Sequence, residues 1–434
     1  MGKANQRIYL RGSILKNRIS SERVDLFDPN ICITMFFDIV GEVDTELLLS
    51  AVNKAFTRFE ATMSKIVLSD DGEAYYEKIP VSACTVKTTQ QDLISLIKEN
   101  EKAPFSLETG ELMRVFVKPS DNKSTVLIMA HHLVGDGKSI IYFIESIMKA
   151  LIEEEQPYSK LHLITEDSLP KESQLPGWMR WWINGFNRSW KKSGKVFGYD
   201  DYYRLHNIYW KERESVILME EFLNEDVKII HKKATDAKVS INSYIITAFL
   251  KANMNMSKTG LAVNARIDNN RTMSNQASGI SIDYAYNDKL PFERNAQEVH
   301  RSIYKKLNRP VNKYFILRFM QQFNSSLIDS IMMHIYGLYD NKVTFKLSKI
   351  MGYKSGGRTS IGITNLTKID IENTYKNYHI EKLYFIPPVV SYSRQTVGIV
   401  TSESGMTITY HCMSDTYNEE KKHNFEKAMN ILLD

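Results

Sequence analysis

In the N-terminal part of the chain, the order of apolar and polar positions predicts strands and helices in alternation. The run ICITMFFDI at 31–39 has the composition of a β-strand. Asp44 has the character of a helix N-cap, and the apolar residues after it recur at helical spacing, at Leu48, Ala51, Val52, Ala55 and Phe59. The same patterns predict strands near 63–68, 74–79, 111–118 and 124–130, and helices over 91–100 and from Lys138 onward.

The stretch from about 153 to 214 interrupts this alternation. It begins polar, contains three prolines and holds all five tryptophans of the chain. Because such stretches connect regular elements, we predict an N-terminal half (1–155), a Trp-rich crossover (156–214) and a C-terminal half (215–434). In the last of these we expect strands near 216–220, 260–266, 279–286, 359–364 and 383–390, a hairpin at 395–412, and helices near 224–237, 241–254, 293–308, 313–336 and 417–433.

Composition narrows the class of protein. The 434 residues carry 56 basic and 51 acidic side chains, a net charge of +5, and 43% are hydrophobic, as in ordinary globular proteins. So small a net charge gives no reason to expect nucleic-acid binding. Cys32, Cys84 and Cys412 are far apart, which argues against a zinc module or a disulfide framework. No segment reaches the roughly 20 apolar residues of a membrane span, so we expect a cytoplasmic protein. We also expect it to be a monomer.

The segment LIMAHHLVGDGK at 127–138 carries the most informative chemistry. An apolar strand leads into His131 and His132, then into a short turn and a helix. Adjacent side chains at a strand end point to opposite faces, so one histidine projects into a given cleft while the other packs. Asp136 is placed to cap the helix, and Gly137 removes a side chain where the backbone enters it. A metal site is disfavoured, because neighbouring histidines diverge and no further ligand cluster appears.

The spacing His-His-x-x-x-Asp-Gly resembles the signature of the superfamily of chloramphenicol acetyltransferase, nonribosomal-peptide condensation domains and CoA-dependent acyltransferases. Weaker similarities lie at Phe105–Arg114, Val239–Asn242, Val263–Arg266 and Ile363–Leu366. The Asp-Phe-Gly-Trp-Gly sequence of plant-type acyltransferases is absent. The resemblance implies two similar α/β halves, each a mixed sheet flanked by helices, with an active-site tunnel between them.

The resemblance also implies roles for individual residues. His132 would be the general base that takes a proton from a hydroxyl or amine as it attacks an acyl thioester. His131 would pack beside the site, and Asp136 would form an ion pair with Arg266 from the second half. The helix start at Gly137 could donate a backbone N–H to the oxyanion. Weaker candidates for substrate contact are Thr364 and Asn365.

The resemblance implies no permanently bound cofactor. We expect acyl-CoA as a co-substrate, with the phosphopantetheine of a carrier protein as the alternative donor, and a small-molecule acceptor. A free-standing condensation enzyme is thus the second functional hypothesis, and a non-catalytic binding relative is the third. The intact motif argues against the third. One basic segment is a candidate for contact with the phosphates of CoA, although we favour the interpretation that it is a solvated loop. Its residues are Lys346, Lys349, Lys354 and Arg358, which flank Gly356-Gly357.

The Trp-rich crossover has two interpretations. Trp178, Trp181 and Trp182 lie on one helical face, and basic residues lie nearby, at Arg180, Arg188, Lys191 and Lys192. A basic aromatic helix can rest on a membrane surface. The favoured alternative is that the crossover packs over the body or covers an apolar acceptor channel, because the rest of the segment lacks a long apolar face.

Overall fold

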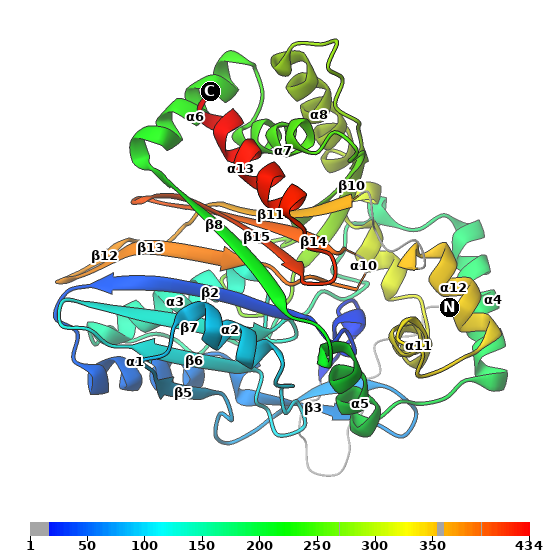
Figure 1. Cartoon of the computed structure of the whole chain (residues 1–434). Coiled ribbons are helices and arrows are strands. Elements are labelled where there is room, and N and C mark those ends of the chain that lie inside the picture. Colours follow the sequence, from blue (N-terminus) through cyan, green and yellow to red (C-terminus); the bar gives the residue numbers. More distant parts are fainter. Residues whose placement is uncertain (1–16, 269, 354–359, 392) are drawn as a thin grey trace.

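Two six-stranded sheets form the body of the protein (Figure 1). The structure is a computed structural model that describes residues 17–268, 270–353, 360–391 and 393–434. The sheets face one another where β13 (Tyr378–Ile386) packs against β14 (Gln395–Ser402) and β15 (Gly405–Met413). This mixed α/β architecture with two sheets and flanking helices confirms the predicted fold class.

The first sheet has the strand order β12-β13-β2-β7-β6-β5. Its other strands are β2 (Cys32–Val40), β5 (Thr85–Thr88), β6 (Met113–Lys118), β7 (Lys123–His131) and β12 (Thr374–Tyr375). Nearly every residue of β2 and β7 is buried, because elements cover the sheet on both faces. Such strands have continuous apolar runs rather than alternating ones, as ICITMFFDI does.

Helices α1 (Thr45–Arg58) and α3 (Gly137–Leu151) pack side by side under the first sheet (Figure 1). The carboxylate of Asp44 caps α1 by accepting a hydrogen bond from the N–H of Leu47 at 2.8 Å, as predicted. Helix α2 (Leu93–Glu101) connects β5 to β6 along the chain. A small separate sheet contains β1 (Asn17–Arg18), β4 (Ala74–Lys78) and β3 (Ser64–Leu68).

The second sheet has the order β10-β9-β11-β14-β15-β8. Its remaining strands are β8 (Ser215–Leu223), β9 (Lys258–Asn264), β10 (Ala277–Asp283) and β11 (Ser360–Lys368). It is mixed, because β11 runs parallel to both β9 and β14 while the other pairs are antiparallel. The outer face is covered by α6 (Asn224–Asp236), α7 (Ile241–Ala252), α8 (Phe292–Leu307) and α13 (Glu419–Leu433) (Figure 1).

Sheet membership does not follow chain order. Strands β12 and β13 come from the C-terminal part of the chain, yet β13 pairs antiparallel with β2 of the first sheet. The predicted strand at 383–390 ends earlier than expected, at Ile386. The reason is the pair Pro387-Pro388, whose residues lack the N–H that a sheet ladder needs.

The crossover is more helical than predicted and is accompanied by later helices. It contains η3 (Lys171–Ser173), α4 (Gly177–Ser193) and α5 (Tyr199–Trp210). The predicted helix over 313–336 is wrong as one element: it is split into α9 (Pro310–Lys313), α10 (Phe315–Met320) and α11 (Ser325–Ile335). Asn324 breaks it, because its side chain accepts a hydrogen bond from the N–H of Leu327 and starts a new helix. Helix α12 (Lys342–Ile350), not predicted, packs against α4 and α11.

The N-terminal half also contains two short 3-10 helices, η1 (Arg23–Asp25) and η2 (Ala61–Met63). The three cysteines are free and buried. Within the described ranges, no helix is both long and apolar enough to cross a membrane.

Candidate active site

The His-motif segment forms a strand, a tight turn and a helix. Strand β7 ends at His131, whose carbonyl accepts a hydrogen bond from the N–H of Val134 at 2.9 Å. Helix α3 begins at Gly137, and Asp136 is its N-cap, accepting from the N–H of Ser139 at 2.9 Å. The first N–H groups of a helix have no partner inside it. The start of α3 therefore places backbone N–H groups that have no partner inside the helix directly after the turn of the motif.

His131 is fixed inside the protein. It is 1% exposed, and its Nδ1 accepts a hydrogen bond from the N–H of Leu133 at 3.2 Å. Its ring meets the edge of Phe105 at a centroid distance of 5.7 Å. Burial, together with the neighbouring His132 and His206, lowers the pKa of His131 to about 3. These are the contacts of a packing side chain that stays neutral at physiological pH.

His132 keeps some access to solvent, because 18% of its side chain is exposed. Its Nδ1 is buried, has no hydrogen-bond partner among the described residues and lies 4.0 Å from Oδ2 of Asp25. That distance is too long for a hydrogen bond. Burial lowers the pKa of His132 below 6.5, and the charges of Asp136 and Asp28 only partly oppose this effect. The imidazole is therefore neutral at pH 7 and can accept a proton.

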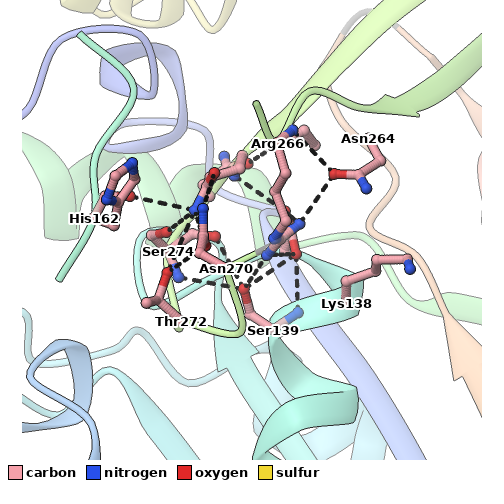
Figure 2. Close-up of polar contacts among 12 residues, drawn as sticks. Lys138, Ser139, His162, Asn264, Arg266, Asn270, Thr272 and Ser274 are labelled. Carbon is pink, nitrogen blue, oxygen red and sulfur yellow. Dashed lines mark hydrogen bonds and ion pairs between the residues drawn. The ribbon is translucent and has the colours of Figure 1, made fainter. Parts of the chain in front are cut away.

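Asp136 and Arg266 form the predicted ion pair between the two halves (Figure 2). Arg266 donates from Nη1 to Oδ2 of Asp136 at 2.8 Å and from Nη2 to Oδ1 at 3.0 Å. The side chain of Arg266 is 4% exposed and that of Asp136 is 7% exposed. Burial opposes ionisation of Asp136, but the charge of Arg266 and several hydrogen bonds outweigh it and lower the pKa. Asp136 is thus ionised, and both of its carboxylate oxygens accept hydrogen bonds, so it cannot also exchange protons with a substrate.

A loop of the C-terminal half, residues 270–277, holds the motif from the other side (Figure 2). The N–H of Gln276 donates to Oδ2 of Asp136 at 3.0 Å, and Oγ of Ser139 donates to the carbonyl of Ser274 at 2.9 Å. Nδ2 of Asn275 donates to Oδ2 of Asp25 at 2.8 Å. One loop therefore fixes both the motif aspartate and the carboxyl group nearest to His132.

Two acidic residues beside His132 were not identified from the sequence. Burial, with the charge of Asp28 adding to it, raises the pKa of Asp25 to about 8. Asp28 accepts hydrogen bonds from the N–H and the Oγ of Ser391, both at 3.0 Å, and burial raises its pKa. Three carboxyl groups within residues 22–28 were the available signal. They lie more than 100 positions before the motif, and no local pattern connects the two.

Gly137 lies against the second sheet. A Cβ atom at this position would come within 2.8 Å of Cδ2 of Leu366, so the glycine permits the close approach. Leu366 precedes an irregularity of β11 in which Thr367 adopts the left-handed conformation at φ +63° and the register shifts. Oδ1 of Asn365 accepts from the N–H of Thr367 at 2.7 Å and stabilises this bulge.

Thr364 and Asn365 remain predictions as substrate contacts. Nδ2 of Asn365 donates to Oδ1 of Asn242 at 3.2 Å, so its described bonds lie within its own half. Of the basic residues predicted near the phosphates of CoA, Lys354 and Arg358 lie outside the described residues. The other two, Lys346 and Lys349, are exposed on α12. Among the described residues, no group of three or more His, Cys, Asp or Glu could hold a metal ion.

A surface cleft of about 360 Å³ opens beside the loop 270–277. It is lined by the basic residues Arg58, Lys160, His162 and Arg271, among others. No residue of the motif lines it, so we do not assign it to the reaction centre. The tunnel implied by the resemblance remains a prediction.

Part of the chain matches a known protein family and several curated proteins. A family model described as Condensation domain matches residues 30–163, from before β2 to beyond α3. The chain is 27% identical over 115 residues to surfactin synthase subunit 1 of Bacillus subtilis (strain 168), and 23% identical over 158 residues to malpinin synthetase of Mortierella alpina. These matches cover 26% and 33% of this chain, but only 3% and 2% of those proteins.

Solved structures resemble the whole chain. The trichothecene 15-O-acetyltransferase of Fusarium sporotrichioides aligns with a TM-score of 0.64 at 12% identity, covering 99% of this chain and 97% of that one. The condensation domain of a monacolin K polyketide synthase aligns with a TM-score of 0.63 at 10% identity, covering 97% and 98%. The fold is thus shared with these two solved structures over nearly the whole chain. The family match covers less than half of the chain, so it shows that residues 30–163 resemble a Condensation domain, while the structural comparisons show the fold of the whole chain.

Proposed function

We propose that this protein transfers an acyl group from a thioester to a hydroxyl or amine acceptor, with His132 as the general base. The observation that carries the proposal is the contrast among the three motif side chains. His131 is buried and its Nδ1 is occupied, and Asp136 is ionised and held by Arg266. His132 alone combines a neutral imidazole with partial exposure.

The chemical step needs only a proton carrier and a stabilised oxyanion. His132 removes the proton of the acceptor as its oxygen or nitrogen attacks the thioester carbonyl. The tetrahedral intermediate then collapses, the carbon–sulfur bond breaks, and the imidazolium returns the proton to the departing thiolate. No covalent acyl-enzyme is required.

The start of α3 is our candidate for oxyanion stabilisation. The dipole of α3 favours negative charge at its N-terminus, and the N–H of Gly137 belongs to its first turn. Asp136 already satisfies the N–H of Ser139. The donors that precede Ser139 are therefore the ones we assign to the intermediate.

For the donor we propose acyl-CoA, the choice made from the sequence. The alternative is an acyl group on the phosphopantetheine of a carrier protein. It is favoured by the Condensation domain match and by the similarity to peptide synthetases. Neither group is a resident cofactor of this protein, because each enters as an acyl thioester and leaves as the free thiol.

The test is release of free thiol from a panel of acyl-CoAs and from the same acyl groups loaded on a carrier protein, with alcohol and amine acceptors. Acceptor-dependent release by the wild type, lost in His132→Ala, is the expected result. The two donor arms distinguish the two classes of thioester. Release that His132→Ala retains in a folded protein would remove the proposed base, and no release in either arm would remove the function.

A further inference from the structure

Helix α4 presents two tryptophans to solvent. Trp178 is 68% exposed and Trp181 is 71% exposed, whereas most large aromatic side chains of this protein are buried. The interpretation that the crossover packs over the body holds for other tryptophans. Trp182 packs against Phe319 and Phe323, and Trp190 donates from Nε1 to Oγ of Ser326 at 2.8 Å. The body of the protein thus uses the opposite side of α4 and leaves Trp178 and Trp181 outside.

The same region of the surface is strongly basic. Helix α4 contains four basic residues and no acidic one, namely Arg180, Arg188, Lys191 and Lys192, and all four are exposed. Helix α12 packs against α4 and contains three lysines and no acidic residue. None of these seven side chains forms an ion pair with a carboxylate of the described residues. Exposed Ile350, at the end of α12, adds apolar area.

We propose that α4, with α12 beside it, docks this protein on an anionic membrane surface. We call this surface the basic tryptophan face, and it consists of Trp178, Trp181, Arg180, Arg188, Lys191 and Lys192 of α4 with Lys346, Lys349 and Ile350 of α12. Indole rings are favoured at the level of lipid headgroups, where one side is apolar and the other is wet. Lysine and arginine next to them are attracted to phosphatidylserine and related lipids.

A membrane fits this face better than a second copy of the chain. Two copies would bring the six positive charges of this face against six, without a carboxylate on either helix to pair with them. The two tryptophans are three positions apart on one helix and stand out from it, which suits shallow insertion. Figure 1 shows α4 and α12 together on one flank of the molecule, away from the outer helices α6, α8 and α13. Docking therefore leaves those helices directed away from the bilayer.

Flotation with vesicles tests the proposal. The full chain is mixed with vesicles of phosphatidylcholine alone or with phosphatidylserine at about 3:1. We expect binding to the anionic vesicles only, weakened by high salt because exposed charges are screened. The variants Trp178→Ala/Trp181→Ala and Arg188→Glu/Lys192→Glu should each bind more weakly by roughly tenfold or more. These substitutions are at exposed positions, so melting temperatures should change little.

A matched control changes the same kinds of residue elsewhere. Leu223→Ala/Lys305→Glu removes an exposed apolar side chain and reverses an exposed charge in the C-terminal half, and it should bind like the wild type. Equal loss in the control would show that net charge, not this face, drives binding. The proposal would be overturned if the wild-type protein did not float with anionic vesicles, or if it bound only to an acidic protein. So would full binding by both α4 variants.

Discussion

The Oδ2 of Asp25 and the Nδ1 of His132 lie 4.0 Å apart, and no hydrogen bond joins them. Asp25 is held from the opposite half of the protein by Nδ2 of Asn275. Because burial raises the pKa of Asp25 to about 8, its carboxyl group is protonated at neutral pH. The base that we propose therefore works beside a neutral acid rather than beside an orienting carboxylate.

Replacing His132 should abolish most activity without unfolding the protein. General-base catalysis typically contributes about 10²–10⁴ in rate, so His132→Ala should lower kcat/KM by that range. His131→Ala should act mainly through stability, because that side chain is buried against Phe105. Steady-state kinetics with a thioester that the wild type turns over, together with melting curves, separates the two effects. If His131→Ala alone were inactive while still folded, the base would be misassigned.

The dependence of kcat/KM on pH should reflect the lowered pKa of His132. Burial lowers the pKa of His132 below 6.5, so the acid limb of log kcat/KM should have its midpoint below that value. Activity should thus persist at pH values where an exposed histidine is already protonated. A thioester whose own hydrolysis is negligible over this range is the suitable donor. A midpoint at or above 6.5 that vanishes in His132→Ala would contradict the burial of this imidazole.

Asp25→Asn should change how stability depends on pH. The folded pKa of Asp25 is about 8, above the unfolded value near 3.9. Its contribution to stability is therefore fully present below about pH 4 and is lost as pH rises through 8. The variant lacks this proton and should lose less stability between pH 5 and 8, as measured by denaturant titration. Glu22, whose pKa burial raises to about 7, remains, so the slope should shrink rather than disappear.

Asp136 and Arg266 should be energetically coupled. Removing one partner of a buried pair leaves an unpaired charge and costs about 3–5 kcal/mol. Asp136→Ala and Arg266→Ala should each lower the free energy of unfolding by this order, and the double variant should cost less than the sum. A coupling energy near zero would reduce Asp136 to a helix cap.

The turn of the motif should not tolerate a methyl group at Gly135. A Cβ there would lie 2.5 Å from Cβ of Ser139, which is fixed by its own hydrogen bonds. Gly135→Ala should therefore destabilise the protein by about 1–3 kcal/mol. Gly185→Ala in α4 is the control, because no atom lies within 4 Å of the added Cβ. That change should stabilise by up to about 1 kcal/mol. Thermal unfolding of both variants checks the contrast.

Local patterns were sufficient for most elements of the body. The apolar runs of β2 and β7 and the helical spacing after Asp44 determine these elements without distant partners. The helix over 313–336 was predicted incorrectly because the apolar period continues through Asn324, while the chain follows the hydrogen bond that its side chain offers. Periodicity measures burial, and it does not detect such competition.

The candidate site was predictable only where a motif linked distant residues. The resemblance joined Asp136 to Arg266, 130 positions away. No sequence motif connects Asp25, Asn275 or Ser391 with His132. Their contacts arise only from the way the two halves pack. The pKa of Asp25 depends on that packing as well, since burial is its main cause.

The pairing of β13 with β2 has a consequence for dissecting this protein. A fragment that ends near residue 214 would lack β12 and β13, so the nine residues of β2 would become an open edge. Exposed apolar edges of this kind recruit other chains and aggregate. The two fragments should accordingly be insoluble when expressed separately and soluble when co-expressed. That behaviour would make the chain a natural candidate for split-protein complementation, in which reassembly of one strand pair restores one fold.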